Sequence, residues 1–273
     1  MKQRSGFTLV EMAIVLVIVG LLIGGLLAAQ SMIETAKINA QVRQFQQLDI
    51  VVSQFKNKYN QLPGDSNLFS PAGNNDGSIS GTQSAGFSWQ TNSATEAGNF
   101  FKHLSDSGMI KDRYQSSVTP IIPGFASPKP VMGENNASLI GITPDGAGAP
   151  PGPYWILCAG NYPADSNFCT AHSYNGNSGG AALTPKQALA LDTKMDDGKP
   201  WTGSVIAAGS GSYVGEPPSP ADGNYNIGCV NTTVADPNSQ YNISSTGDWW
   251  GGRSDVRFCN LEIKMFSIAG GGQ

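Results

Sequence analysis

Hydrophobic and polar residues divide the first 59 positions into two kinds of helix. Residues 7–29 form an apolar run with one ionisable side chain, Glu11, and about 20 apolar residues suffice for a helix to cross a bilayer. From Ile38 to Tyr59, apolar residues recur every three or four positions, which is typical of an amphipathic helix with one buried stripe. The polar positions between them are Gln41, Arg43, Gln46, Gln47, Asp49, Lys56 and Lys58. The pattern predicts one continuous helix over residues 7–59, about 80 Å long.

The sequence Leu62-Pro63-Gly64-Asp65 predicts a turn that ends this helix, followed by a long loop over residues 66–90. Within the loop, Asn74-Asn75-Asp76-Gly77 has the alternating oxygens of a calcium loop. Ala72 and Gln83 occupy the first and last ligand positions of that pattern, which therefore fails at both ends. We favour a plain Asn/Gly turn, with a calcium site at Asn74 and Asp76 as the alternative.

Two shorter helices are predicted from their start signals. Ser93-Ala94-Thr95-Glu96 has the spacing of a capping box and opens a helix that ends at Gly108, with His103 on its surface or at the edge of the core. Thr184-Pro185 opens another helix, which ends at Gly198. Its C-terminal end carries an acidic cluster, which we expect lysines to offset, with cation binding as the alternative: Asp192, Asp196 and Asp197, beside Lys194 and Lys199.

Strand character appears over five segments: residues 137–142, 154–159, 203–208, 225–234 and 256–268. In the last segment, Leu261, Ile263 and Met265 alternate with Glu262 and Lys264, which predicts a strand with one buried face. Strands that follow one long helix predict an α+β fold, in which an antiparallel sheet packs on the amphipathic half of the helix.

Composition and charge limit the function of the part that follows the helix. Residues 60–273 are numerous enough for a folded head, and the composition of the whole chain, with 34 Gly, 17 Pro and only 13% charged residues, indicates many loops and turns. The chain has a net charge of −4, and the part after Tyr59 has ten Lys and Arg against 17 Asp and Glu. Because binding to phosphate backbones depends on Lys and Arg, broad nucleic-acid binding is not expected.

Four cysteines lie beyond the apolar run, and an even number of exported cysteines favours disulfides over a metal site. Four cysteines allow three pairings. Proximity along the chain favours Cys158 with Cys169 and Cys229 with Cys259.

The sequence offers no set of catalytic residues. Nucleophilic catalysis needs a nucleophile, a base and an orienting group, but the chain has two histidines and no Gly-x-Ser-x-Gly motif. The glycines of residues 209–215 have the wrong spacing for a dinucleotide loop, and Pro217-Pro218 prevent an immediate helix. We therefore expect a protein that is not an enzyme and needs no cofactor.

Glu11 requires an explanation, because a carboxylate in lipid costs about 2.5–3.5 kcal/mol and usually marks function. Cleavage after Gly6 would create an amino group on Phe7, about 6 Å along the helix axis from Glu11. The amino group of a neighbouring subunit, shifted along the axis, could neutralise Glu11 at least as well.

Gly6-Phe7-Thr8-Leu9-Val10-Glu11, followed by an apolar helix, resembles the processing site of the type IV pilin superfamily, which includes type II secretion pseudopilins. The resemblance implies cleavage after Gly6 by a prepilin peptidase, N-methylation of Phe7, and assembly through Phe7, Thr8 and Glu11. It also implies that the helix can unwind at Gly24 and Gly25 in a filament, the alternative being close packing of small residues there.

The resemblance divides the chain into a leader (residues 1–6), a membrane and filament-core half-helix (7–29), an amphipathic half-helix (30–59) and a periplasmic or extracellular head (60–273). The precursor would cross the inner membrane once. It would then polymerise with itself and other pilins, through an assembly platform and an ATPase, into a type IV pilus for adhesion, motility or uptake.

Other functions remain open at this point. A pseudopilin of a type II secretion system has the same signal. An ordinary secretory signal that ends at Leu27-Ala28-Ala29, or a plain membrane anchor, would instead make a membrane-anchored or secreted binding protein. Such a protein could bind carbohydrate through Trp249-Trp250.

Overall fold

The protein was analysed as a computed structural model. The structure describes residues 9–80, 82–84, 88–90, 96–116, 123–133, 137–143, 152–159, 182–200, 202–209, 229–230, 240–241, 243 and 259–265. The helices are α1 (Leu9–Tyr59), α2 (Glu96–Asp106) and α3 (Pro185–Met195). The strands are β1 (Thr82–Ser84), β2 (Ser88–Gln90), β3 (Ala137–Ile142), β4 (Tyr154–Ala159), β5 (Val205–Gly209) and β6 (Cys259–Lys264).

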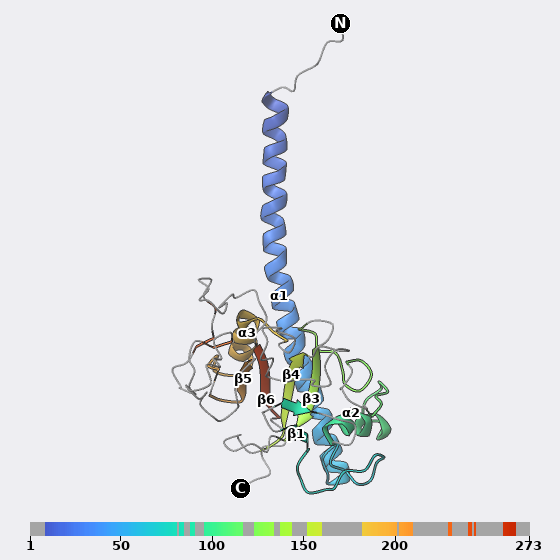
Figure 1. Cartoon of the computed structure of the whole chain (residues 1–273). Coiled ribbons are helices and arrows are strands. Elements are labelled where there is room, and N and C mark those ends of the chain that lie inside the picture. Colours follow the sequence, from blue (N-terminus) through green and yellow to red (C-terminus); the bar gives the residue numbers. More distant parts are fainter. Residues whose placement is uncertain are drawn as a thin grey trace.

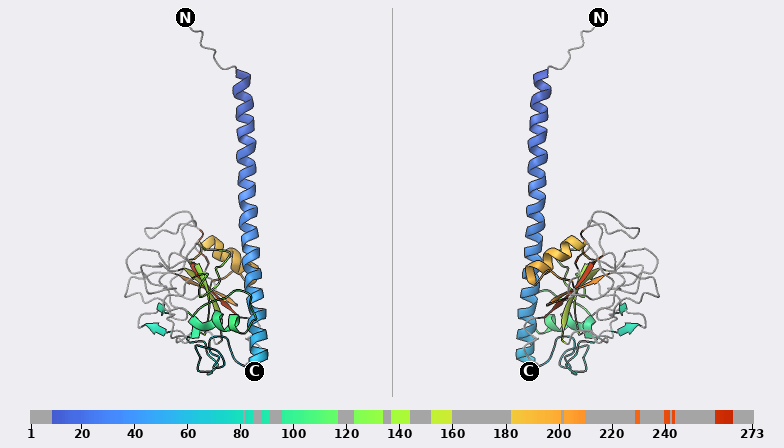
Figure 2. Two further views of the ribbon diagram at one scale, coloured as in Figure 1. Left: turned by 90° about the vertical axis from the view of Figure 1, so that its right-hand side faces the viewer. Right: turned by 90° about the vertical axis from the view of Figure 1, so that its left-hand side faces the viewer.

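Helix α1 is one continuous rod of 51 residues. Its N-terminal half projects away from the head, and its C-terminal half lies along one side of the head (Figures 1 and 2). The helix ends where predicted: Asn60 takes the left-handed conformation (φ 54°), and its N–H donates to the Lys56 carbonyl at 2.7 Å. A residue in that conformation cannot continue a right-handed helix, so the chain turns into the head.

The main sheet has four antiparallel strands in the order β3-β4-β6-β5. Its register places Leu139, Leu157, Leu261 and Ala207 in one row across the strands. This row and the neighbouring one with Trp155 form the face that packs toward α1, while α2 and α3 lie beside the lower half of the rod (Figure 2). The predicted α+β fold, a long helix with an antiparallel sheet packed on it, is confirmed.

The core joins α1 to the sheet through aromatic side chains. Phe45 and Phe55 of α1 are buried in the same cluster as Trp155. Phe100 of α2 meets the Trp155 ring edge-on, with 5.4 Å between the ring centroids. Gly141, which pairs with Trp155 in the sheet, leaves room for this contact: a Cβ there would lie 2.6 Å from the Phe100 ring.

The structure corrects several sequence predictions. Helix α2 is described from Glu96 onward, and the predicted cap at Ser93 lies outside the described residues. The predicted loop over residues 66–90 contains the antiparallel pair β1 and β2. Both faces of the strand β6 are buried, where one buried face was predicted, because Glu262 is as buried as Leu261 and Ile263. The strand predicted over residues 225–234 lies outside the described residues, except for Cys229 and Val230, and Val230 bridges to Tyr241.

Candidate functional site

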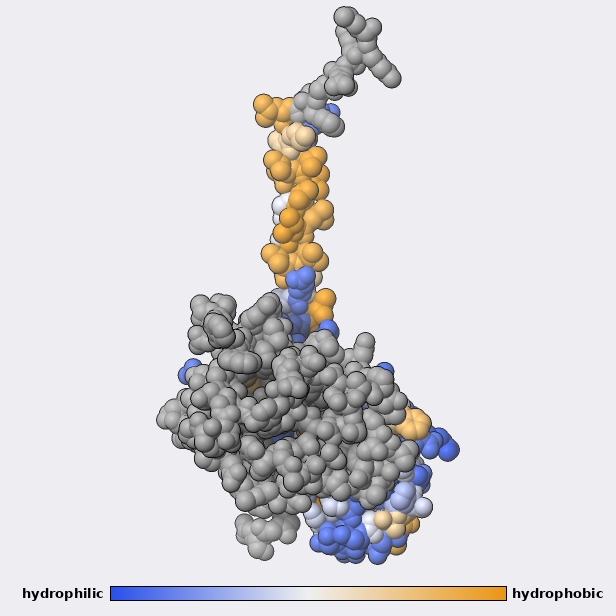
Figure 3. All heavy atoms as spheres, in the orientation of Figure 1, coloured by the Kyte–Doolittle hydropathy of each residue, from blue (hydrophilic) through white to orange (hydrophobic). Residues whose placement is uncertain are grey.

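The projecting half of α1 has a predominantly apolar surface (Figure 3). Its large hydrophobic side chains from Leu9 to Ile33 are between 43% and 88% exposed. Within the described residues, α1 is the one helix long and apolar enough to cross a membrane. None of its most apolar 18-residue segment is buried in the protein. A surface of this size is not stable in water, so it requires lipid or other helices around it.

Glu11 lies in the first turn of α1, on the exposed surface of the rod. It is the one charged side chain among residues 9–33. A carboxylate in a first turn is favoured by the helix dipole and the unpaired N–H groups there. The predicted processing and assembly residues Gly6, Phe7 and Thr8 lie outside the described residues, so their roles remain predictions.

Gly24 and Gly25 lie in the middle of the projecting rod, where α1 is regularly helical. A Cβ built at either glycine would have no atom within 4 Å. The surface there is open for the close approach of another helix, which small residues permit. Unwinding at these glycines in a filament remains a prediction.

Two polar side chains of α1 fasten the head to the rod, although the sequence pattern placed both among the polar positions. Gln41 is fully buried and accepts the Met132 N–H at 2.9 Å. Asp49 is 7% exposed and accepts the indole N–H of Trp155 at 2.6 Å. The head is therefore attached to α1 by directional contacts as well as by the apolar stripe.

The loop after α1 brings together three carboxylates from distant positions: Asp65, Asp76 and Glu96. Their ligand atoms lie within 4.8 Å of one another, and Asp65 and Glu96 are buried. Of the two residues proposed for a calcium site, Asp76 belongs to this group. Asn74 instead donates its side-chain amide to Asp76 at 2.8 Å. The spacing of residues 74–77 gave no sign of Asp65 or Glu96.

Every oxygen of these carboxylates accepts a hydrogen bond. Asp65 accepts the N–H groups of Asp76 and Gly77, both at 3.0 Å. Glu96 accepts the N–H groups of Asn74 at 2.9 Å and Ser80 at 2.8 Å, and Asp76 accepts from Ser78 and Asn74. Burial, followed by repulsion from Glu96, raises the pKa of Asp65. The carboxylates thus replace a regular backbone ladder and hold the loop in shape, with an arrangement of oxygens that a divalent cation could also use.

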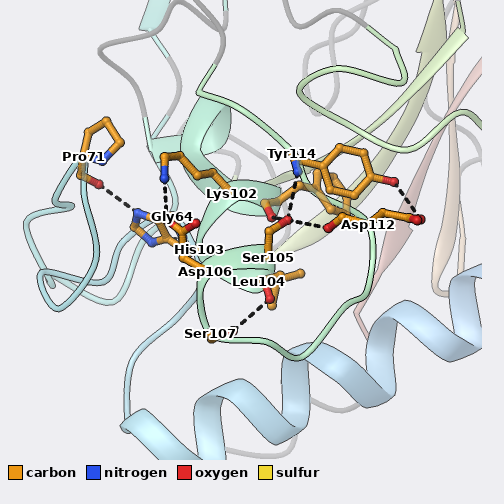
Figure 4. A network of polar contacts seen from close by, with 11 residues as sticks. Gly64, Pro71, Lys102, His103, Leu104, Ser105, Asp106, Ser107, Asp112 and Tyr114 are labelled. Carbon is orange, nitrogen blue, oxygen red and sulfur yellow. Dashed lines mark hydrogen bonds and ion pairs between the residues drawn. The ribbon is translucent and has the colours of Figure 1, made fainter.

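His103 holds the same loop from the side of α2 (Figure 4). It is fully buried; the Gly64 N–H donates to its Nδ1 at 3.0 Å, and its Nε2 lies 2.8 Å from the Pro71 carbonyl oxygen. Nδ1 must therefore be the acceptor, so the ring is neutral with its proton on Nε2. Burial lowers the pKa of His103. Both nitrogens are occupied in holding the chain, and His103 is inside the core rather than on the helix surface.

The second acidic cluster follows α3, whose start has the predicted cap at Thr184, here a full capping box with Gln187. Asp192 is buried and accepts the Tyr241 hydroxyl at 2.8 Å and the Gly198 N–H at 3.2 Å. Burial raises the pKa of Asp192 to about 7. Among the described residues, neither Lys194 nor Lys199 forms an ion pair with the cluster. The carboxylate of Asp192 is therefore stabilised by hydrogen bonds, where the sequence predicted that lysines would offset the charge of the cluster.

Two observations concern the strands β4 and β6. Cys229 and Cys259 form a disulfide with a sequence separation of 30, and Cys158 is also disulfide-bonded, while Cys169 lies outside the described residues.

Glu262 is 1% exposed, and its Oε2 has no hydrogen-bond partner among the described residues. Burial raises the pKa of Glu262 to about 8. Trp249 and Trp250, the proposed carbohydrate-binding residues, lie outside the described residues.

Comparison with known proteins adds one finding at the N-terminus. Residues 1–27 match the prokaryotic N-terminal methylation motif. No curated protein and no solved structure matches the chain. The match covers the start of the exposed apolar rod and includes Glu11. The chain therefore carries the N-terminal methylation signal of the type IV pilin and pseudopilin superfamily, on a pilin-like α+β architecture.

Proposed function

We propose that this protein is a structural subunit of a type IV pilus. The observation that supports the proposal most directly is the exposed half of α1, an apolar rod that carries both the methylation motif and Glu11. In the precursor the rod lies in the inner membrane, with the head in the periplasm. In the fibre the rods of many subunits enclose one another, and the heads form the outside.

In this proposal, a prepilin peptidase cleaves after Gly6, and the new amino group of Phe7 is methylated. The carboxylate of Glu11 then meets the Phe7 amino group of a neighbouring subunit. An opposite charge at the same depth removes most of the cost of a carboxylate in an apolar environment. The proteins that carry this signal are typically structural, so the chain needs no reaction of its own.

Mass spectrometry of the mature N-terminus tests the first step. The proposal expects a chain that begins with N-methyl-Phe7. A chain that begins at Gln30 would indicate an ordinary secretory signal, and one that keeps Met1 would indicate a plain anchor. Either result would refute the proposal.

Glu11→Val tests the second step, with Asp112→Asn as a control for the loss of one carboxylate at an exposed position of the head. Glu11→Val is expected to insert into the membrane and to be cleaved, but to give little sheared filament. Asp112→Asn is expected to give the yield of the unaltered protein. Normal assembly of Glu11→Val would remove the role proposed for the carboxylate.

The two kinds of filament are separated by where the fibre ends. A pilus subunit is expected in fibres sheared from the cell surface. A pseudopilin is expected to remain in the periplasm, and its deletion is expected to stop secretion of folded proteins.

A further inference from the structure

A groove lies where the rod enters the head. It belongs neither to the exposed apolar surface of the rod nor to the packed core of the head. It is lined by residues of α1, of the segment before β3 and of α3: Gln30, Ile33, Glu34, Lys37, Val131, Met132, Gly133 and Gln187. Its volume is about 260 Å³. That is slightly less than the about 300–1,000 Å³ of pockets that enclose a whole drug-sized ligand. The groove therefore fits a small polar group better than a whole ligand.

The groove contains one charge of each sign. Glu34 and Lys37 are three residues apart on α1, so they lie on one side of the helix. Within the described residues, the ion pair joins Lys102 to Asp106, and neither Glu34 nor Lys37 belongs to an ion pair. Gln187 uses its side-chain oxygen to accept the Thr184 N–H at 3.1 Å, so its amide hydrogens can serve as donors in the groove.

The position of the groove along α1 gives the depth at which it meets a membrane. From Leu9 to Ile33 the helix rises about 36 Å, whereas the hydrocarbon core of a bilayer is about 30 Å thick. With the apolar rod in the bilayer, residues 30–37 reach the headgroup region of the outer leaflet. Ile33 is 56% exposed and Val131 44% exposed, so apolar surface leads from the rod into the groove.

We propose that this groove binds the headgroup of a zwitterionic phospholipid of the membrane that holds the precursor. The phosphate lies against the Lys37 ammonium and the Gln187 amide, the lipid ammonium lies against Glu34, and the first methylenes follow Ile33 and Val131. Glu34 disfavours a purely anionic headgroup. The bound lipid would fix how deep the head sits before assembly. This inference rests on the membrane-anchored precursor alone, so it and the filament proposal can fail separately.

The test uses the full chain in detergent micelles and native mass spectrometry. Phosphatidylethanolamine and phosphatidylglycerol with the same acyl chains are titrated separately. A charged contact near the headgroups contributes about 1 kcal/mol, which is about fivefold in affinity. Phosphatidylethanolamine is expected to bind about fivefold more tightly. Glu34→Gln is expected to remove this preference, and Lys37→Gln to weaken both lipids about fivefold.

Two variants repeat these charge changes on exposed positions away from the groove: Lys111→Gln and Asp112→Asn. Both are expected to bind lipid as the unaltered chain does. Equal affinity of the unaltered chain for the two lipids would overturn the proposal, as would control variants that change binding as much as the groove variants. Val131→Cys tests the other occupant: if thiol labelling is blocked in assembled fibres but not in the membrane-held precursor, the groove belongs to a second copy of the chain and the proposal is overturned.

Discussion

The indole of Trp155 donates its N–H to the carboxylate of Asp49 at 2.6 Å, joining the second strand of the main sheet to the middle of α1. The two residues are 106 positions apart, and both are buried. A buried carboxylate needs hydrogen-bond donors, because each donor that is removed leaves part of the desolvation cost of the charge uncompensated. The contact therefore stabilises the attachment of the head to the rod.

Trp155→Phe keeps an aromatic ring but removes the donor to Asp49. We expect the free energy of unfolding of the head to fall by about 1–3 kcal/mol, with a further loss from the smaller ring. Urea unfolding followed by circular dichroism measures this. Gln47→Ala, on the exposed side of the same helix, is the control and should change stability little. If both variants unfold at the same urea concentration, the contact is not important for stability.

His103 should make the head sensitive to acid. Its pKa in the folded chain is below the ordinary value of 6.5, because burial outweighs the hydrogen bond to Pro71. The unfolded chain therefore binds the proton first, and stability is lost as the pH falls below about 6.5, by up to about 1.4 kcal/mol per pH unit. The charges of Lys102, Asp106 and Glu96 act on the same ring and modify the shift.

The measurement for His103 is a series of urea unfolding curves between pH 7.5 and 5. His103→Gln is expected to be less stable at pH 7.5, since Gly64 and Pro71 lose well-placed partners. It should also lack part of the decline seen in the unaltered chain. Parallel pH profiles for the two proteins would contradict a role for the imidazole.

Glu262 should have the opposite pH dependence. Its folded pKa of about 8 lies above its ordinary value of 4.5, because burial disfavours the charged carboxylate. The folded chain keeps the proton longer, so its contribution to stability is present below about pH 4.5 and is lost as the pH rises toward 8. Glu262→Gln has nearly the same shape but cannot ionise. We expect it to be more stable than the unaltered chain at pH 8, and the difference to shrink toward pH 5.

Asp112→Asn serves as the control for Glu262→Gln, because Asp112 is exposed and the change in charge is the same. Its stability difference from the unaltered chain should vary little with pH over that range. A constant difference for Glu262→Gln would mean that Glu262 is already ionised when the chain is folded.

Gly141→Ala should disturb the aromatic contact above the sheet. The added methyl group would lie 2.6 Å from the Phe100 ring, closer than real Cβ contacts. Forcing an extra group into a packed core costs about 1–3 kcal/mol. The melting temperature of the variant, and of Gly141→Ala combined with Phe100→Leu, tests the cause. If the smaller side chain at position 100 recovers none of the loss, the clash is not the reason for it.

The patterns that depend on neighbouring residues predicted most of the fold. The long helix follows from a periodicity that lasts to Tyr59, and the strands β3 and β4 were found with their observed bounds, because apolar segments between Pro- and Gly-rich turns are a local signal. The cap of α3 at Thr184 is also local and was found.

The contacts that the sequence did not reveal join distant parts of the chain. The helical pattern places Gln41 among the solvated positions. It is buried because it accepts the main-chain N–H of Met132, 91 residues away, and no local pattern shows that contact. Glu96 has the spacing of a capping residue, but it accepts from Asn74 and Ser80, which come before α2. Such residues are polar in any local pattern, and only tertiary packing makes them interior.

The hydrogen bonds from the segment before β3 to α1 have a geometric consequence for any assembly. Gln41 and Gln44 both accept main-chain N–H groups of this segment, those of Met132 and Val131, and Gln44 also donates to the Lys129 carbonyl. These contacts lock the azimuth of the head to the rotation of the rod about its own axis. When one side of the rod turns toward its neighbours, the same turn decides which surface of the head points outward.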